Sequence, residues 1–262
     1  MRRNRDTASV RQRALAEFQA QRFAEASVLF EESADGESVE LDRIEQAEKT
    51  LRAANTACED ALKVFTKDSF PDDWAGVQST MAQVFAAQER WAEAAAAEEN
   101  VLTVHPESMK DLELAESIYH EHLFRFDRAF ELNARRVEHG DGELDFVEKH
   151  LTTARFEACA SRAEVLEGKT SDKNMRTILI ALRFACLAAG GKKDGARAAA
   201  AQLRESMTGL EKGNWDFGGT KYFVSRHAAF AGKSQAWVGL FDALEQGDEA
   251  KARTALSVVA RE

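Results

Sequence analysis

Few residues in this chain would interrupt a helix. The 262 residues include only 2 prolines. Runs of β-branched residues are almost absent, whereas Ala, Leu, Glu, Gln, Lys and Arg, the strong helix formers, dominate. Aromatic residues make up 8% of the chain, which does not favour a β-sandwich. The composition therefore predicts an all-α protein, long enough for one elongated domain or two compact ones.

A positive net charge is also missing. The formal net charge is −10, and such a field repels a phosphate backbone unless basic side chains gather on one face. The one basic cluster lies at the N-terminus and is more typical of a solvated end: Arg2, Arg3, Arg5, Arg11 and Arg13. We therefore expect no binding to nucleic acid.

Cysteines are few and far apart. Cys58, Cys159 and Cys186 are odd in number, and each lies in an apolar helical stretch. This argues against a disulfide framework and fits a reducing compartment, with Cys159 and Cys186 as core residues. No apolar run approaches the roughly 18 residues that span a bilayer, and no apolar segment follows the charged N-terminus. The sequence predicts a cytoplasmic protein that does not contact a membrane.

A short pattern recurs along the chain: an arginine, an aromatic residue, two further residues and a small residue. Its copies are 22–26, 90–94, 125–129 and 155–159. The small residues are separated by 68, 35 and 30 positions, so a further copy is expected near residue 60, where Ala61 stands. Steps of about 34 residues are typical of one helix–turn–helix unit.

The spacing and the best copy, residues 75–106, resemble the tetratricopeptide repeat family. The residues at the family's consensus places are Met81, Ala82, Phe85, Trp91, Ala94, Val101, Leu102 and Pro106. Glu98 departs from the family, which usually has an aromatic residue there. The preceding stretch, with Trp74, Ala75 and Gln78, is similar to the Trp-Ala-x-x-Gln opening of bacterial members.

This resemblance implies a right-handed α-solenoid of about six to seven helix–turn–helix units. We expect repeats over 1–208, an irregular Gly- and aromatic-rich insertion with a short helix over 209–233, and a capping helix pair over 234–262, because a solenoid must cover its last apolar face. The expected helices are 9–21, 23–34, 40–53, 55–68, 73–87, 91–104, 108–123, 126–138, 142–153, 156–167, 172–189, 194–209, 220–230, 234–246 and 249–261.

Motifs for catalysis or cofactor binding are weak. The Gly-Lys-Ser stretch at 232–234 lacks the glycine that a phosphate-binding loop has five residues earlier, since position 227 is His. His120 and His122, at i and i+2, lie on different faces of a helix and cannot share one metal by themselves. We therefore expect no enzymatic activity, no cofactor and no metal site.

The resemblance implies a scaffold that binds another protein or peptide in a concave groove lined by the first helices of the repeats. The candidate groove residues are Ser79, Gln83, Asp111, Leu114, Ile118 and Glu121. Their mixture of small, apolar and acidic side chains favours a helical or extended segment with basic character. Two alternatives stay open. One is a ligand- or peptide-sensing domain of a bacterial signalling or defence system, and the other is an enzyme with a site around Trp215, His227 and Lys233.

Overall fold

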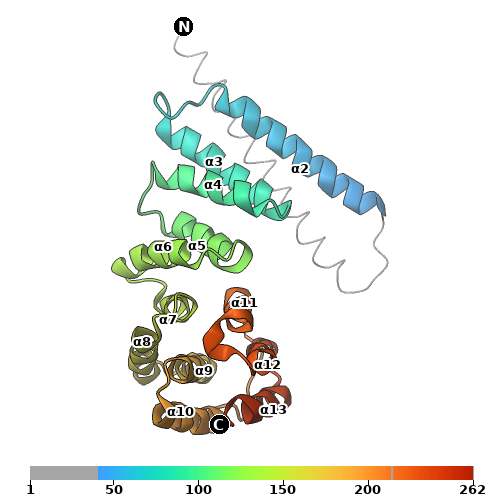
Figure 1. Ribbon diagram of the computed structural model, residues 1–262. Coiled ribbons are helices and arrows are strands. Elements are labelled where there is room, and N and C mark those ends of the chain that lie inside the picture. The colour runs from blue at the N-terminus through green and yellow to red at the C-terminus, as the bar shows by residue number, and fades with distance from the viewer. Residues whose placement is uncertain (1–40, 214, 262) are drawn as a thin grey trace. The chain divides into compact units, whose positions relative to one another are not determined.

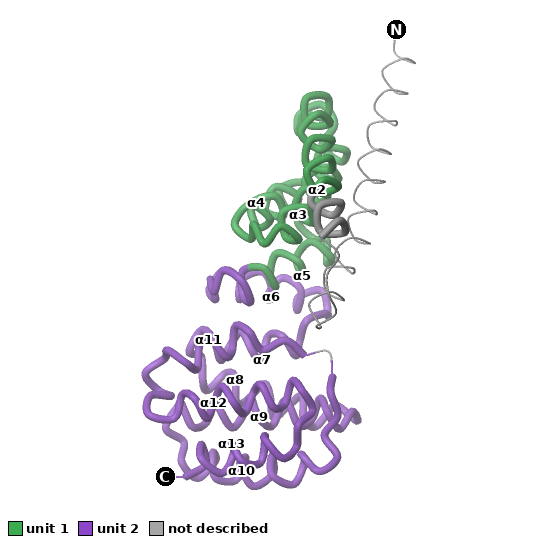
Figure 2. Tube along the Cα trace, turned by 90° about the vertical axis from the view of Figure 1, so that its right-hand side faces the viewer, with its two compact units in different colours: residues 1–118 green, residues 119–262 purple. Residues whose placement is uncertain are grey.

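The computed structural model describes residues 41–213 and 215–261, with side chains from residue 49 onward. Over this part of the chain every regular element is a helix and no strand occurs (Figure 1), which confirms the all-α prediction. The expected helices 9–21 and 23–34 lie outside the described residues. The chain divides into two compact units, Met1–Ile118 and Tyr119–Glu262 (Figure 2).

The first unit is a series of helices in which each packs on the next. It contains α2 (Leu41–Leu62), α3 (Pro71–Ala87), α4 (Trp91–Leu102) and α5 (Met109–Ser117). Pro71 lies in the first turn of α3, where the N–H that it lacks would have no helical partner. A small core of Cys58, Ala61, Phe65 and Val77 joins α2 to α3.

Helix α2 corrects one prediction. The expected break between helices 40–53 and 55–68 is wrong, because α2 continues through it to Leu62. The stretch 53–57 contains neither glycine nor proline, and Ala54 in its middle is fully buried. Without a residue that disrupts the backbone hydrogen bonds, the helix has no reason to stop there.

The second unit starts within a short π-helix, η1 (Ile118–His122), from Tyr119 on. Its other helices are α6 (Phe126–Glu138), α7 (Glu143–Thr152), α8 (Phe156–Lys169), α9 (Lys173–Ala189), α10 (Lys193–Ser206), α11 (Gly218–Arg226), the 3₁₀ turn η2 (Ala228–Phe230), α12 (Ser234–Gln246) and α13 (Glu249–Val259). After α10 the chain returns, so that α11 contacts α7 and α13 contacts α10 (Figure 1). One hydrophobic core extends from α7 to α13.

Most helix boundaries agree with the sequence prediction to within three residues. α6 and α12 coincide with the predicted 126–138 and 234–246. The segments predicted as single helices at 108–123 and 220–230 are each divided in two, as α5 with η1 and as α11 with η2. None of the described helices is both long and apolar enough to span a membrane.

The recurring arginine–aromatic pattern forms the same turn at each described copy. The arginine is the N-cap residue, the aromatic residue begins the helix, and the small residue is fully buried one turn later. The residue before each arginine has a positive φ, between 51° and 57°: Glu89, Phe124 and Ala154. This left-handed residue reverses the chain at the end of the preceding helix.

The disulfide between Cys159 and Cys186 contradicts the expectation that all three cysteines are reduced. Both residues are buried, as predicted for core positions, but their sulfurs are bonded and their Cα atoms are 6.2 Å apart. The sequence prediction failed because α8 packs closely on α9, which brings together two cysteines 27 residues apart. Cys58 is a free thiol, and burial raises its pKa to about 11.

Candidate functional site: a buried polar cluster

Helix α7 is covered on nearly all sides. Its residues from Phe146 to Thr152 are all buried, because α6, α8, α9 and α11 pack around it. Four of these seven buried side chains are polar: Glu148, Lys149, His150 and Thr152. Polar groups removed from water must find partners inside the protein, since an unpaired one costs several kcal/mol. Some partners are on α7 itself, such as the Phe146 carbonyl next to His150, and those of Thr152 and Glu148 also come from η1 and α11.

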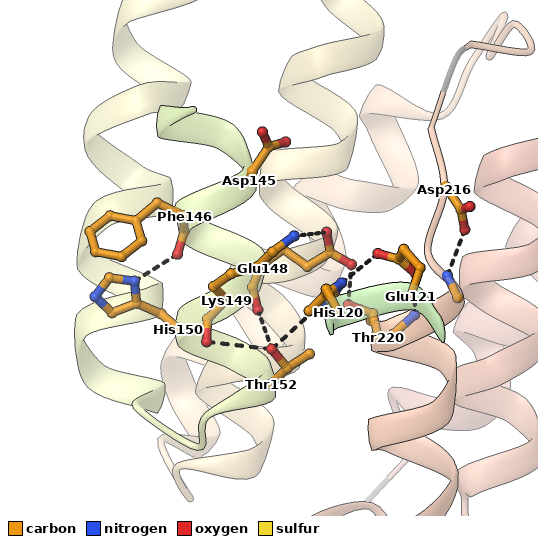
Figure 3. A network of polar contacts seen from close by, with 12 residues as sticks. His120, Glu121, Asp145, Phe146, Glu148, Lys149, His150, Thr152, Asp216 and Thr220 are labelled. Carbon is orange, nitrogen blue, oxygen red and sulfur yellow. Dashed lines mark hydrogen bonds and ion pairs between the residues drawn. The ribbon is translucent and has the colours of Figure 1, made fainter. Parts of the chain in front are cut away.

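His120 lies at the centre of this cluster and is fully buried. Its Nδ1 atom contacts Oε1 of Glu121, and its Nε2 atom lies 3.2 Å from the hydroxyl of Thr152 (Figure 3). The other carboxylate oxygen of Glu121, Oε2, accepts a hydrogen bond from the backbone N–H of Gly219. Three elements that are distant in sequence, η1, α7 and α11, therefore meet at one imidazole ring.

Glu148 is the second carboxylate of the cluster. Its Oε1 atom accepts a hydrogen bond from the hydroxyl of Thr220, and Oε2 is 3.7 Å from Nζ of Lys149. Burial raises the pKa of Glu148, and the neighbouring charges of His120 and Lys149 oppose that rise. His120, Glu121 and Glu148 each offer one ligand atom, and these atoms all lie within 4.8 Å of one another.

Two glycines allow α11 to approach this closely. A Cβ atom on Gly219 would lie 2.5 Å from the imidazole of His120, and one on Gly218 would lie 2.7 Å from Oε2 of Glu121. Any larger residue would push the start of α11 away from the cluster. With glycine there, the backbone N–H of Gly219 in the first turn reaches the Glu121 carboxylate, which the helix dipole also favours.

Aromatic contacts also hold the turn after η1 against α11. Phe124 has a φ of 51°, a conformation that a bulky residue rarely adopts. Its ring stacks on Tyr222 of α11, with centroids 3.7 Å apart, and Phe126 contacts both Tyr222 and Phe223. The turn after η1 and the helix α11 are thus held together next to the cluster.

A cavity of about 140 Å³ adjoins Glu148. It is lined by Leu144, Asp145, Glu148, Ile178, Leu182, Trp215, Asp216 and Phe217. Asp145 is paired with Arg136 at 3.1 Å, and Asp216 accepts a hydrogen bond from the N–H of Gly218 at 2.8 Å. The cavity is therefore lined by three carboxylates, those of Asp145, Glu148 and Asp216, together with apolar side chains.

The six predicted groove residues fall into three environments. Asp111 and Ile118 are buried, and Glu121 belongs to the cluster around His120. The partly exposed ones are Ser79, Gln83 and Leu114. That these residues bind a partner stays a prediction.

The residues considered for an enzyme site have different neighbours. Trp215 lines the cavity beside Glu148. His227 contacts Phe156 and Phe223 and caps η2 through Nδ1, whereas Nζ of Lys233 contacts backbone carbonyls at the end of α13.

Sequence reasoning missed the part of the cluster that is distant along the chain. It weighed His120 with Glu121 and His122, but His122 is exposed, and the third side chain is Glu148 from another helix. The Gly218–Gly219 pair at the start of a helix was the available signal, because adjacent glycines there indicate close backbone approach. Comparison with known proteins adds no identity, since no family model, no curated protein and no solved structure matches the chain.

Proposed function

We propose that this chain is a helical-repeat scaffold that binds a peptide or helical segment of another protein. The proposal includes the solenoid arrangement and the tetratricopeptide-like character expected from the sequence, and it assigns no catalytic activity. Support comes from the three turns at residues 89–91, 124–126 and 154–156, which repeat one backbone geometry at the expected spacing. In a chain built from recurring helix pairs, equivalent helix faces form one extended surface, which suits an elongated partner.

The observation that carries the proposal is a contact between α3 and α5. Ser79 and Leu114 occupy the same place in consecutive copies, and three residues before Leu114 the carboxylate of Asp111 lies 3.4 Å from the Ser79 hydroxyl. The first helices of two successive pairs therefore touch at one polar contact in the first unit. Gln83 and Leu114 are partly exposed on these two helices, and we propose that a partner contacts both.

Photo-crosslinking tests this surface directly. A photoreactive amino acid at position 83 or 114 should capture a protein from the native cell lysate, and one at the exposed position 117 of α5 should not. The captured segment, made as a synthetic peptide, should bind the purified chain, and Leu114→Glu should weaken that binding at least about tenfold. Ser117→Glu adds the same charge on the exposed side of α5 and serves as the control.

Ile118 is unsuitable for this test because it is only 1% exposed, so a charge there would disrupt the core. Equal peptide binding by Leu114→Glu and Ser117→Glu would contradict the proposal, as would crosslinks at 117 that match those at 83 and 114. Circular dichroism establishes that both variants keep the helical content of the wild type.

A second candidate is a domain that senses a small ligand. The cavity beside Glu148 favours it, because two aromatic residues, Trp215 and Phe217, and three carboxylates line one small space. Such a lining suits a compact cation. A ligand-dependent change in the scattering radius of the purified chain would distinguish a sensor from a rigid scaffold.

A further inference from the structure

We propose that His120, Glu121 and Glu148 bind a divalent transition-metal ion. This inference is independent of the scaffold function, since it concerns a site inside the second unit and needs no partner protein. Among the described residues, this is the one place where three side chains of metal-binding type converge.

The surroundings of Thr152 are compatible with His120 as a metal ligand. The Thr152 hydroxyl lies 3.2 Å from the backbone carbonyl of Glu148, to which it can donate its single proton. Its oxygen can then accept a hydrogen bond from Nε2–H of His120, 3.2 Å away. In that tautomer Nδ1 presents its lone pair on the side of Oε1 of Glu121 and is available to a metal ion.

The spacing fits a metal ion. Nitrogen and carboxylate ligands lie about 2.1 Å from zinc, so two ligands of one tetrahedral ion are about 3.4 Å apart. The three ligand atoms lie within 4.8 Å of one another, so side-chain movements of roughly 1.4 Å or less bring the most distant atoms to one ion. Glu121 must also move away from Nδ1 of His120, because these two atoms are at hydrogen-bond distance. Rotation of the two glutamate side chains supplies such a movement without changing the backbone.

Each ligand also has the outer support that metal sites require. Thr152 holds Nε2 of His120, the N–H of Gly219 holds Oε2 of Glu121, and Thr220 holds Oε1 of Glu148. Such contacts orient the ligands and fix the histidine tautomer. They come from two helices, α7 and α11, so the site forms only when the second unit is folded.

The π-helix singles out this copy of the repeat turn. In the turns at Arg90 and Arg155, the arginine N–H bonds to the carbonyl five residues earlier, but Arg125 N–H bonds to Tyr119, six residues earlier. The extra residue belongs to η1, which carries His120 and Glu121. π-helical insertions are rare and occur frequently at functional sites. The turns at Arg90 and Arg155 form without a π-helix.

Charge favours a divalent ion over a proton. Glu121 and Glu148 are both nearly buried, with side chains 10% exposed, and Lys149 is the cation next to Glu148. One proton neutralises one carboxylate, whereas a divalent ion interacts with both and with the imidazole. An imidazole with two carboxylates suits Zn²⁺ and Mn²⁺. The cavity beside Glu148 is also lined by Asp145 and Asp216, which places two further carboxylates near the site.

Metal titration of the purified full chain tests the proposal. After treatment with a chelator, the wild type should take up one Zn²⁺ or one Mn²⁺ per chain in isothermal titration calorimetry, and its melting temperature should rise with the ion. His120→Gln and Glu148→Gln should lose this binding. The matched controls, His122→Gln on the same π-turn and Glu143→Gln on α7, are exposed and should bind as the wild type does.

Thr152→Val provides a measurement that does not depend on removing a ligand. It leaves the three ligands in place but removes the group that orients His120, so the affinity for the ion should fall by about 10- to 100-fold. The wild type taking up neither ion would overturn the proposal and leave a proton between His120 and Glu121. Undiminished binding by folded His120→Gln and Glu148→Gln would also overturn it, by placing the ion elsewhere.

Discussion

Two buried glutamates, one in each unit, differ in the polar groups around their carboxylates. No N–H or hydroxyl donor reaches either carboxylate oxygen of Glu98 on α4, whose polar neighbour is the Asp111 carboxyl, and the residue is fully buried. Burial, together with the nearby charge of Asp111, raises the pKa of Glu98 to about 8. Glu148 on α7 is also buried, but it contacts Thr220 and Lys149 and lies beside His120.

The two glutamates show that a carboxyl group can be buried either at an apolar place or among polar partners. Glu98 takes the place of an apolar residue and is compatible with its surroundings only when protonated. Glu148 is part of a set of groups arranged around a carboxylate. A protein gains no function from the first arrangement by itself, whereas the second positions several side chains from different helices at one point.

Replacing Glu148 should have the largest effect on stability. Glu148→Leu removes the acceptor of Thr220 and the anion beside Lys149, and both neighbours stay buried. We expect the free energy of unfolding to fall by about 4 kcal/mol, as for a broken buried pair. Urea unfolding followed by circular dichroism measures it. A loss below about 1 kcal/mol would show that the polar cluster does not hold the second unit together.

Replacing Glu98 should instead raise the free energy of unfolding, by an amount that depends on pH. The pKa of Glu98 is about 8 in the folded chain against an ordinary value of 4.5, so the folded state binds more protons between these values. Stability from this group therefore falls as pH rises from about 4.5 through about 8. Glu98→Met, which has no charge, should leave stability nearly unchanged at pH 5 and raise it by about 3 kcal/mol at pH 9.

Urea unfolding at a series of pH values gives this profile. Glu93→Met on the exposed side of the same helix is the control and should show no such pH dependence. If Glu98→Met and the wild type keep a constant difference between pH 5 and pH 9, Glu98 is ionised in the folded chain and the comparison with Glu148 fails.

The smallest effect concerns a single hydroxyl of the cluster. Thr220→Val keeps the shape of the side chain and removes the donor to Glu148, which should cost about 1.5 kcal/mol. The corresponding change in the first unit, Ser79→Ala, should cost less, because its contact with Asp111 is long at 3.4 Å. A double-mutant cycle sharpens the result: in the Glu148→Leu background, Thr220→Val should cost almost nothing. Equal costs in both backgrounds would mean that the hydrogen bond contributes nothing.

The helices were predictable because their signals are local. α6 and α12 were predicted residue for residue, and the arginine–aromatic turn marks the start of α6. The division of α2 was predicted wrongly because the repeat spacing was given more weight than the absence of a helix breaker in 53–57.

The cluster was not predictable from neighbouring residues. Glu148 lies 28 residues after His120, and the N–H of Gly219 reaches Glu121 across 98 positions. The contact depends on the chain returning after α10 to place α11 on α7, and no pattern within one helix encodes that return. The disulfide was missed for a different reason, since it joins the consecutive helices α8 and α9, and no pattern within either helix shows that their cysteines meet.

The bond between Cys159 and Cys186 also has a mechanical consequence. Stretching a helical array by its two ends separates neighbouring helices first, but this bond ties α8 to α9 across their junction. The 27 residue steps between the two cysteines cannot be drawn out while the bond is intact. An extended residue spans about 3.5 Å, so a fully stretched oxidised chain is roughly 90 Å shorter than a reduced one. The redox state of its surroundings thus sets how far this protein can be pulled.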